Sequence, residues 1–302
     1  MKRFLSGLSL FGVMALLLAA GASAGELTRT FEKKDQIRIS LVSGSCVVEA
    51  ADVDEIRVML EHRYHPRDSF EPIMRERGDV LFLEEEIHGS NSGESTWTLQ
   101  VPRDTEIDFS SASGDLTVHG LRAEVQASIA SGDIEAEDCT GEFRLVTASG
   151  DVRMSRCSGD FELSAASGDV VADDCHGSFE LSTASGDVRA QQVVIDGPSS
   201  FSTASGDADV KLGESPDFDL EVSSASGDAT LDFQGHPVKG SFEMVCKLRS
   251  GRIESPFEFE HESKFRGDGD DGRYIRKEFT REQDSPHVLI RTASGTAALI
   301  DG

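Results

Sequence analysis

Short runs of alternating hydrophobic and polar residues recur along most of the chain, and many of them end at the tetrapeptide Ala-Ser-Gly-Asp. The first four intervals between these tetrapeptides are 18 residues each. A fixed interval of this kind indicates a repeat architecture. The serine of the motif stands at positions 113, 131, 149, 167, 185, 205 and 226, and a final Ala-Ser-Gly-Thr places a serine at 294.

Hydrophobic residues keep constant positions relative to that serine. They lie six, four and two residues before it, as in Phe161, Leu163 and Ala165, and again just after the aspartate, as in Val170 and Ala172. Alternation with a period of two is typical of strands that bury one face. Each repeat is therefore expected to contain two short strands.

A second turn, marked by a glycine, lies near the middle of each repeat, at Gly141, Gly159 and Gly177. The nine residues of each half-repeat are too few for a strand and a crossover helix. The sequence therefore predicts an all-β fold, a parallel β-solenoid with two strands in each coil of about 18 residues and a coil spacing of about 4.8 Å.

The same register extends to Ser43 and Ser250, which brings the predicted coils to ten. Two excursions interrupt the repeat. The first contains alternating runs at 55–63, 79–87 and 95–101, which predict antiparallel strands in an N-terminal β-meander. The second, at 255–287, predicts a C-terminal hairpin that caps the exposed strand edges.

The N-terminus has the pattern of a cleavable export signal. Lys2 and Arg3 precede an apolar run at 8–20, and small residues follow up to Ala24. The run is shorter than the roughly 20 residues that span a bilayer, so we expect cleavage and no stable membrane span. The predicted divisions are a signal peptide at 1–24, an N-terminal β region with the first coil at 25–110, and the repeat solenoid at 111–302. The expected location is periplasmic or secreted.

The chain is strongly acidic, with 55 Asp and Glu against 29 Lys and Arg and a formal charge of -26. Such a body repels phosphate, which argues against nucleic acid as a partner. The hydrophobic content of 38% is low for a globular protein. A core of regularly stacked small residues accounts for this value without disorder.

Part of the acidic excess is ordered by the repeat. The motif aspartates are expected to stack one coil apart and to accept backbone N–H bonds within their own turns. The alternative is a row of weak Ca²⁺ sites, but the Gly-Gly-x-Gly-x-Asp pattern of calcium-binding solenoids is absent. No other metal or cofactor is expected. The aspartates are Asp115, Asp133, Asp151, Asp169, Asp187, Asp207 and Asp228.

The serine and glycine of each motif are expected to be structural turn residues, because glycine adopts positive φ without strain. These pairs are Ser113 and Gly114, Ser131 and Gly132, Ser149 and Gly150, Ser167 and Gly168, and Ser185 and Gly186. A serine nucleophile repeated in every coil would need a base in every coil, and no histidine column accompanies it.

Cys139, Cys157 and Cys175 are 18 residues apart and predict a buried column. Adjacent coils bring neighbouring Cα atoms within disulfide range, so the spacing permits one bridge among them in an exported protein. Cys46 and Cys246 also fall on inward positions. The pairing among the five stays open, and the absence of a CxxC pair argues against a zinc or redox site.

Other polar clusters carry weaker signals. His62 and His65 lie close to Glu61 and Asp68, and a polar strand end is favoured there over a metal site. An EF-hand that begins at Asp268 would require different residues four and five positions later, where the chain has glycine and arginine. No catalytic residue set is expected, because HExxH, Walker, GxSxG and dinucleotide motifs are absent.

The Ser-Gly-Asp coils, the segment Leu99-Gln100-Val101-Pro102 and the final Thr292-Ala293-Ser294-Gly295 resemble a bacterial family. It is known as a putative-adhesin domain of unknown function and is related to the autotransporter-adhesin head type. The resemblance covers residues 26–302. It implies an exported β-helical domain without a demonstrated reaction or catalytic set.

Two classes of function follow. The first is an exported, non-enzymatic solenoid, an adhesin or envelope-associated scaffold that binds an envelope protein or a glycan. The alternative is a polysaccharide-active lyase or hydrolase, since parallel β-helices host such enzymes. That chemistry needs a local, unrepeated set of acids, whereas the acids here are periodic, so the sequence favours the binding function.

Overall fold

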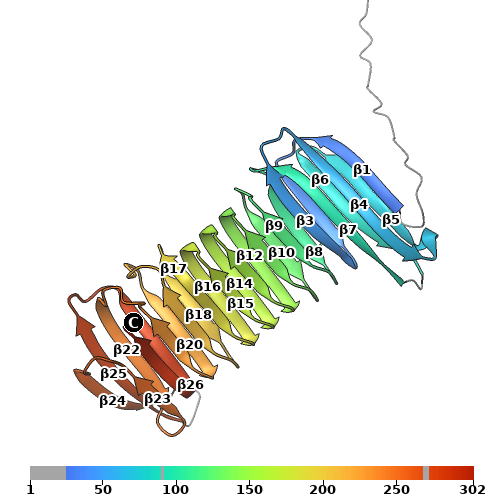
Figure 1. Cartoon of the computed structure of the whole chain (residues 1–302). Helices are drawn as coiled ribbons and strands as arrows, with labels where there is room; N and C mark the ends of the chain where they lie inside the picture. Colours follow the sequence, from blue (N-terminus) through green and yellow to red (C-terminus); the bar gives the residue numbers. More distant parts are fainter. Residues whose placement is uncertain (1–24, 90–91, 268–271) are drawn as a thin grey trace, which may run out of the picture.

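The structure is a computed structural model that describes residues 25–89, 92–267 and 272–302. The predicted signal peptide at 1–24 lies outside the described residues, as does Asp268, where the sequence analysis tested for an EF-hand. The strands stack along one long axis, from the blue N-terminal end to the red C-terminal end (Figure 1). Within the described ranges, one 3-10 turn at Arg67–Ser69 is the only helical segment, and no helix has the length and apolarity to cross a membrane.

The strands form two long faces, which we call sheet A and sheet B. Sheet A contains, in spatial order, β1 (Gly25–Glu32), β4 (Glu55–His65), β7 (Ser92–Pro102), β3 (Gly44–Ala51), β9 (Leu116–His119), β11 (Ile134–Glu137), β13 (Val152–Ser155), β15 (Val170–Asp173), β17 (Val188–Ile195), β19 (Ala208–Leu212), β21 (Ala229–Asp232), the second half of β26 (His287–Ile300) and β23 (Gly251–Glu254).

Sheet B lies on the other side of the core and is likewise built from one strand of each coil. It contains β5 (Phe70–Arg77), β6 (Val80–Ile87), β2 (Gln36–Leu41), β8 (Glu106–Ser111), β10 (Val125–Ile129), β12 (Thr140–Ser149), β14 (Ser158–Ser167), β16 (His176–Ser185), β18 (Ser199–Thr203), β20 (Leu220–Ser226), the first half of β26, β22 (Gly240–Lys247), β25 (Arg273–Arg281) and β24 (His261–Arg266).

The repeat stacks in parallel and in register. Residues of β14 pair with those 18 positions later in β16, so that Phe161 lies opposite Phe179 and Leu163 opposite Leu181. Strands β13 and β15 pair in the same way on sheet A. The predicted all-β class with parallel strands is therefore confirmed.

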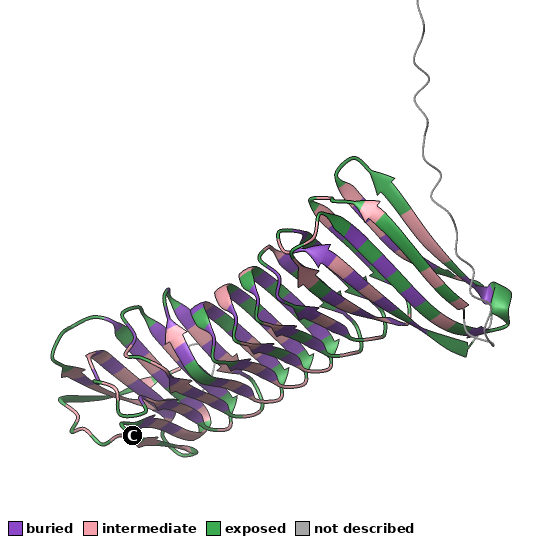
Figure 2. Cartoon of the chain, turned by 45° about the horizontal axis from the view of Figure 1, so that its top comes forward, coloured by how far each residue is buried: buried purple, intermediate pink, exposed green. Residues whose placement is uncertain are grey.

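The core lies between the two sheets and is built from columns of like residues. Buried and exposed positions alternate along the strands (Figure 2). Phe143, Phe161, Phe179 and Phe201 form one column, with ring centroids 5.0 to 5.7 Å apart. Because each ring covers the next one along the stack, a core of modest total hydrophobicity excludes water throughout.

The turn glycines are required by space as well as by conformation. Gly168 has φ +141°, and a Cβ atom at this position would lie 1.9 Å from the carbonyl oxygen of Gly150 in the preceding coil. Gly186 stands in the same relation to Gly168, at 2.1 Å. Only glycine permits this approach, which explains why the motif keeps glycine in every coil.

The three runs predicted as an N-terminal β-meander all form strands with an antiparallel neighbour, but they do not form a meander. β6 pairs in parallel with β2, and β7 pairs in parallel with β3, so together they form a further coil outside the first one. Antiparallel pairing begins only beyond them, where β5 joins β6 and β4 joins β7. Alternation has the same period in parallel and antiparallel strands, so the pattern could not settle the direction.

The coils at the C-terminal end do not follow chain order. β26 pairs with β20 and β21 on one side and with β22 and β23 on the other, so the coil of Ser294 lies between those of Ser226 and Ser250. The predicted hairpin is present as β24 and β25, and β25 pairs with the outer edge of β22.

A buried carboxylate fastens the N-terminal end. The Glu85 side chain is 7% exposed and accepts hydrogen bonds from Trp97 Nε1 at 2.8 Å, from the backbone N–H of Val42 at 2.9 Å and from the Ser95 hydroxyl. These donors belong to β7 and to the first turn of the stack, so Glu85 joins the outer coil to the repeat. The sequence did not predict this residue.

Gly168→Ala is expected to destabilise the protein by about 3 kcal/mol or more, because the new Cβ atom meets a backbone carbonyl that cannot move without disturbing the next coil. Gly78→Ala is the matched control, since Gly78 also has positive φ (+60°) but has open space around it, and should cost about 1 kcal/mol. Urea unfolding followed by circular dichroism measures both. Equal losses in the two variants would contradict the steric argument.

Glu85→Gln is expected to lower the free energy of unfolding by about 2 kcal/mol, because the new amide group faces donors that now lack an acceptor. Fluorescence of Trp97, the single tryptophan, reports this region directly. Glu84→Gln removes a neighbouring, partly exposed acid that pairs with Arg75, and serves as the control with an expected change below about 1 kcal/mol. If Glu85→Gln left the free energy of unfolding unchanged, the buried hydrogen bonds of Glu85 would contribute nothing to stability.

Candidate functional site

A long groove runs along the outer face of sheet B, with a volume of about 1490 Å³. We call it the serine–alanine groove, because its walls come from the three residues that precede each motif serine. It extends from Ser110 in β8 through the successive coils to Thr292 in β26. No single coil makes this site, since each contributes the same short segment.

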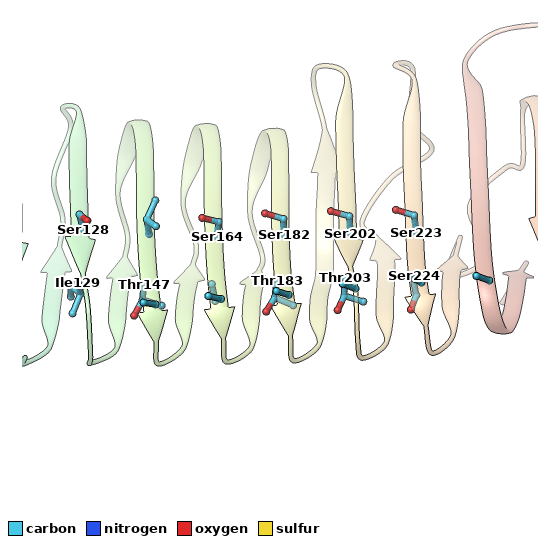
Figure 3. Close-up of a pocket in the computed structure, with 18 of the residues that line it drawn as sticks. Ser128, Ile129, Thr147, Ser164, Ser182, Thr183, Ser202, Thr203, Ser223 and Ser224 are labelled. Atoms are coloured by element: carbon cyan, nitrogen blue, oxygen red, sulfur yellow. The ribbon is translucent and has the colours of Figure 1, made fainter. Parts of the chain in front are cut away.

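Two columns of residues line the groove; the alanines are mostly exposed, whereas the serines range from exposed at Ser128 to buried at Ser223. One contains mainly serines, which stand in a row in Figure 3, and the other contains the alanines just before the motif serine. Their small side chains leave the sheet surface hollow between larger flanking residues. The serine column is Ser110, Ser128, Ser164, Ser182, Ser202 and Ser223, with Val146 in one coil, and the alanine column is Ala112, Ala130, Ala148, Ala166, Ala184, Ala204, Ala225 and Ala293.

Between these columns, a buried row of hydroxyls ties neighbouring coils together (Figure 3). Thr183 Oγ1 donates to the carbonyl oxygen of Gly168 at 2.9 Å, and Thr203 Oγ1 donates to that of Gly186 at 2.8 Å. Thr147, Ser224 and Thr292 repeat the bond at 2.8 to 3.0 Å. These bonds hold the groove floor at the coil spacing.

The groove is nearly free of charge, unlike the rest of the molecule. Arg291 is the one charged residue among the described residues that line it. At the C-terminal end the lining includes an aromatic pair, Phe265 and Tyr274, with ring centroids 5.7 Å apart. Arg276 lies over the Phe265 ring at 5.0 Å.

The motif aspartates form a ladder of hydrogen bonds beside the turns. The Oδ1 atom of each accepts a bond from the backbone N–H of the equivalent residue in the next coil, at 2.8 to 2.9 Å from Asp115 to Asp228. The ladder begins at Ser45, whose hydroxyl accepts from the Asp115 N–H at 3.2 Å, and ends at Thr296, whose N–H donates to Asp228 at 2.7 Å.

The donor to each aspartate therefore differs from the sequence expectation, which placed it in the same turn. Parallel stacking in register turns the next coil's N–H toward the carboxylate, so the bond joins coils. Arginines neutralise part of the row: Arg153 donates to Asp151 Oδ2 at 2.5 Å, and Arg189 donates to Asp169 Oδ2 at 2.7 Å and also to Asp187.

A family model described as Toastrack DUF4097 matches residues 67–264, more than half of the chain. The chain belongs to this family. This agrees with the resemblance to a bacterial family of unknown function that the sequence showed. The relation to autotransporter-adhesin heads stays a prediction. No curated protein sequence matches this Toastrack chain significantly.

Solved structures resemble it distantly. A putative adhesin from Bacteroides fragilis is 12% identical, with a TM-score of 0.43 and coverage of 91% of this chain and 97% of that one. A putative cell adhesion protein from Clostridium sporogenes is 11% identical, with a TM-score of 0.29 and coverage of 91% and 98%. A putative lipid binding protein from Parabacteroides distasonis is 13% identical, with a TM-score of 0.34 and coverage of 68% and 89%. Such low similarity does not bear on function.

Potential metal ligands gather away from the ladder of the Toastrack chain. In the described part of the chain, groups of three His, Cys, Asp or Glu ligands occur twice, and neither includes a motif aspartate. One of them is His119, Glu137 and Asp138, but Arg156 donates to both of these carboxylates. The other group consists of Glu71, Glu86 and His88, all exposed.

The cysteines and the histidine pair occupy interior and edge positions. Cys139, Cys157 and Cys175 are buried in one column, and each thiol donates to the carbonyl two residues earlier at 3.2 to 3.3 Å. All five cysteines are free. His62 packs against Phe70 with ring centroids 4.6 Å apart, and burial lowers the pKa of its imidazole.

Asp169→Asn tests the ladder through its pH dependence. Partial burial raises the pKa of Asp169, but the Asp187 N–H and the Arg189 guanidinium lower it by more, so the net pKa lies below its ordinary value. A carboxyl group with a lowered folded pKa stabilises the fold above its unfolded pKa of about 4, and this contribution is lost as pH falls through the folded value.

The variant should therefore lose about 1 kcal/mol at neutral pH and show a smaller further loss below about pH 4 than the parent protein. Urea unfolding across this pH range measures the difference. Asp217→Asn, on an exposed loop, removes the same charge without a ladder bond. If the free energy of unfolding fell equally below about pH 4 in both variants, the ladder bond would have no part in the pH dependence.

Proposed function

We propose that this Toastrack protein is an exported, non-enzymatic binding protein that holds an extended, uncharged polysaccharide along the serine–alanine groove. The observation that carries the proposal is the groove itself, a continuous channel that Arg291 alone among its described lining residues charges, on a chain of charge -26. An anionic polymer would be repelled by the surrounding carboxylates, whereas a neutral one meets no such cost.

The shape of the groove supports a linear ligand. Eight coils from Ser110 to Thr292 at the usual strand spacing extend on the order of 30 Å, which suits a chain of several sugars. Each coil offers at most one serine hydroxyl and one alanine methyl group, so contacts repeat along the ligand. The Phe265 and Tyr274 rings at one end supply the kind of apolar surface on which sugar rings stack.

The alternative, a polysaccharide lyase or hydrolase, has less support. Such enzymes use one or two positioned carboxyl groups within reach of the bond that breaks. The described residues that line the groove include no Asp, Glu or His. The motif aspartates lie at the turns, where their Oδ1 atoms already accept backbone bonds, so we assign them to the architecture of the turns and not to Ca²⁺ binding or catalysis.

Filling the groove tests the proposal. Ala166 and Ala184 are exposed on neighbouring coils, and tryptophan at either position would occupy the channel without changing charge. The protein would be passed over immobilised cellulose, chitin and mannan, with an acidic polysaccharide for comparison. We expect retention on an uncharged polymer and a dissociation constant at least about tenfold higher for Ala166→Trp and Ala184→Trp.

Val171→Trp places the same ring on the outer face of sheet A and is the matched control, with no expected change. Equal binding by all three variants would remove the groove from the ligand contact. Retention only on the acidic polymer, or on none, would overturn the proposed ligand class. Turnover that depends on a single carboxylate would overturn the non-enzymatic assignment.

A further inference from the structure

The C-terminal strand β26 occupies a slot between elements that precede it in the chain. Its first half pairs with β20 and β22, where Ile290 lies between Val222 and Met244. Its second half pairs with β21 and β23, where Ala297 lies between Ala229 and Ile253. Among the described strands, no backbone pairing joins β20 or β21 directly to β22 or β23. The cap formed by β22 to β25 is therefore joined to the stack through β26.

The rest of the chain holds this slot at the width of one coil. The segment 233–239 leads from β21 to β22 across the end of β26, and its N–H groups at Phe233 and Gly235 donate to the carbonyl oxygens of Ile300 and Asp301 at 2.9 and 2.8 Å. Side chains add specific bonds: Ser250 Oγ donates to the Ala293 carbonyl oxygen at 2.8 Å. All these partners precede β26 in the chain.

The slot selects the sequence of β26 as well as its backbone. Ser294 lies in register with Ser226, and Gly295 lies against the Gly227 carbonyl, where a Cβ atom would be 2.2 Å from oxygen. The Asp228 carboxylate accepts the N–H of Thr296 as the last step of the ladder. A strand with the same sequence from a second copy of this chain satisfies each of these requirements without any new contact.

We propose that β26 exchanges reciprocally between two copies of this protein, so that each copy closes the slot of the other. A loop of only five residues, 282–286, connects β25 to β26 on the opposite flank of β22, and short connections of this kind favour exchange when they open. Two copies that fold close together present open slots and unpaired β26 strands at the same time. Once exchanged, the strands are held by pairing on both flanks, so the dimer reverts slowly.

The exchange also reaches the groove. Arg291, Thr292 and Ala293 of β26 line its C-terminal part. In the dimer, each groove is completed by three residues of the other copy. This inference goes beyond the proposed function, and its test uses no polysaccharide, so the two stand or fall separately.

The experiment places one cysteine on each of two copies. Arg291 Nε and Glu221 Oε1 lie 3.5 Å apart on β26 and β20, and both side chains are exposed, at 59% and 37%. Glu221→Cys carries one affinity tag and Arg291→Cys another. The two proteins are unfolded, mixed, refolded at several concentrations and treated with a short thiol crosslinker. The five native thiols are buried and should not react in the folded protein.

The control uses Arg144 and Glu162, an exposed ion pair at 2.7 Å that lies directly opposite in register on β12 and β14 in the middle of the stack. We expect a doubly tagged covalent dimer from Glu221→Cys with Arg291→Cys that rises with protein concentration. It should exceed the yield from Arg144→Cys with Glu162→Cys by about tenfold or more. Each pair placed within one copy checks that crosslinking works. A yield equal to the control at every concentration, with crosslinking intact within single copies, would overturn the proposal.

Discussion

The carbonyl oxygen of each turn glycine lies against the Cα atom of the glycine one coil further on, at a distance that no side chain permits. This close approach brings successive turns into register, and the register then determines the rest. It places the phenylalanine rings in one column, aligns the buried threonine hydroxyls with the glycine carbonyls, and presents each aspartate to the N–H of the next turn. A chain that is poor in large hydrophobic residues can fold in this way, since every coil repeats the same few contacts.

The register also explains how the fold accommodates its acidic residues. Aspartates stacked one coil apart would repel one another in isolation. In the ladder, each carboxylate faces a backbone N–H, and Arg153 and Arg189 lie among the carboxylates of the central coils. The groove, in contrast, carries small neutral residues in nearly every coil. Charge is thus segregated by column, which follows from a repeat that assigns one residue type to each position.

The columns of like residues could be predicted from the sequence, because period-two alternation and the fixed 18-residue interval can both be read directly along the chain. The direction of β6 and β7 could not, since the outward and inward positions of a strand are the same in either direction. The position of β26 in the stack could not be predicted either, because the motif around Ser294 would fit beside any of the coils. Glu85 stands in a run of three glutamates, and only the approach of Trp97 and Val42 distinguishes it from its less buried neighbours. The groove could not be predicted, because the serine and alanine positions that line it carry neither the charge nor the apolar bulk by which a sequence pattern indicates a site.

The two ends of the stack differ from its middle for a physical reason. A repeated coil satisfies its backbone with identical neighbours, whereas a terminal coil has a free edge that must be closed by other means. At the N-terminal end, β4 and β5 turn antiparallel, and Glu85 binds the outer coil to the first turn. At the C-terminal end, the chain skips one position, builds a cap and returns to fill the gap with β26. Properties that depend on a unique residue therefore concentrate at the ends, and properties that depend on number, such as the length of the groove, belong to the repeat.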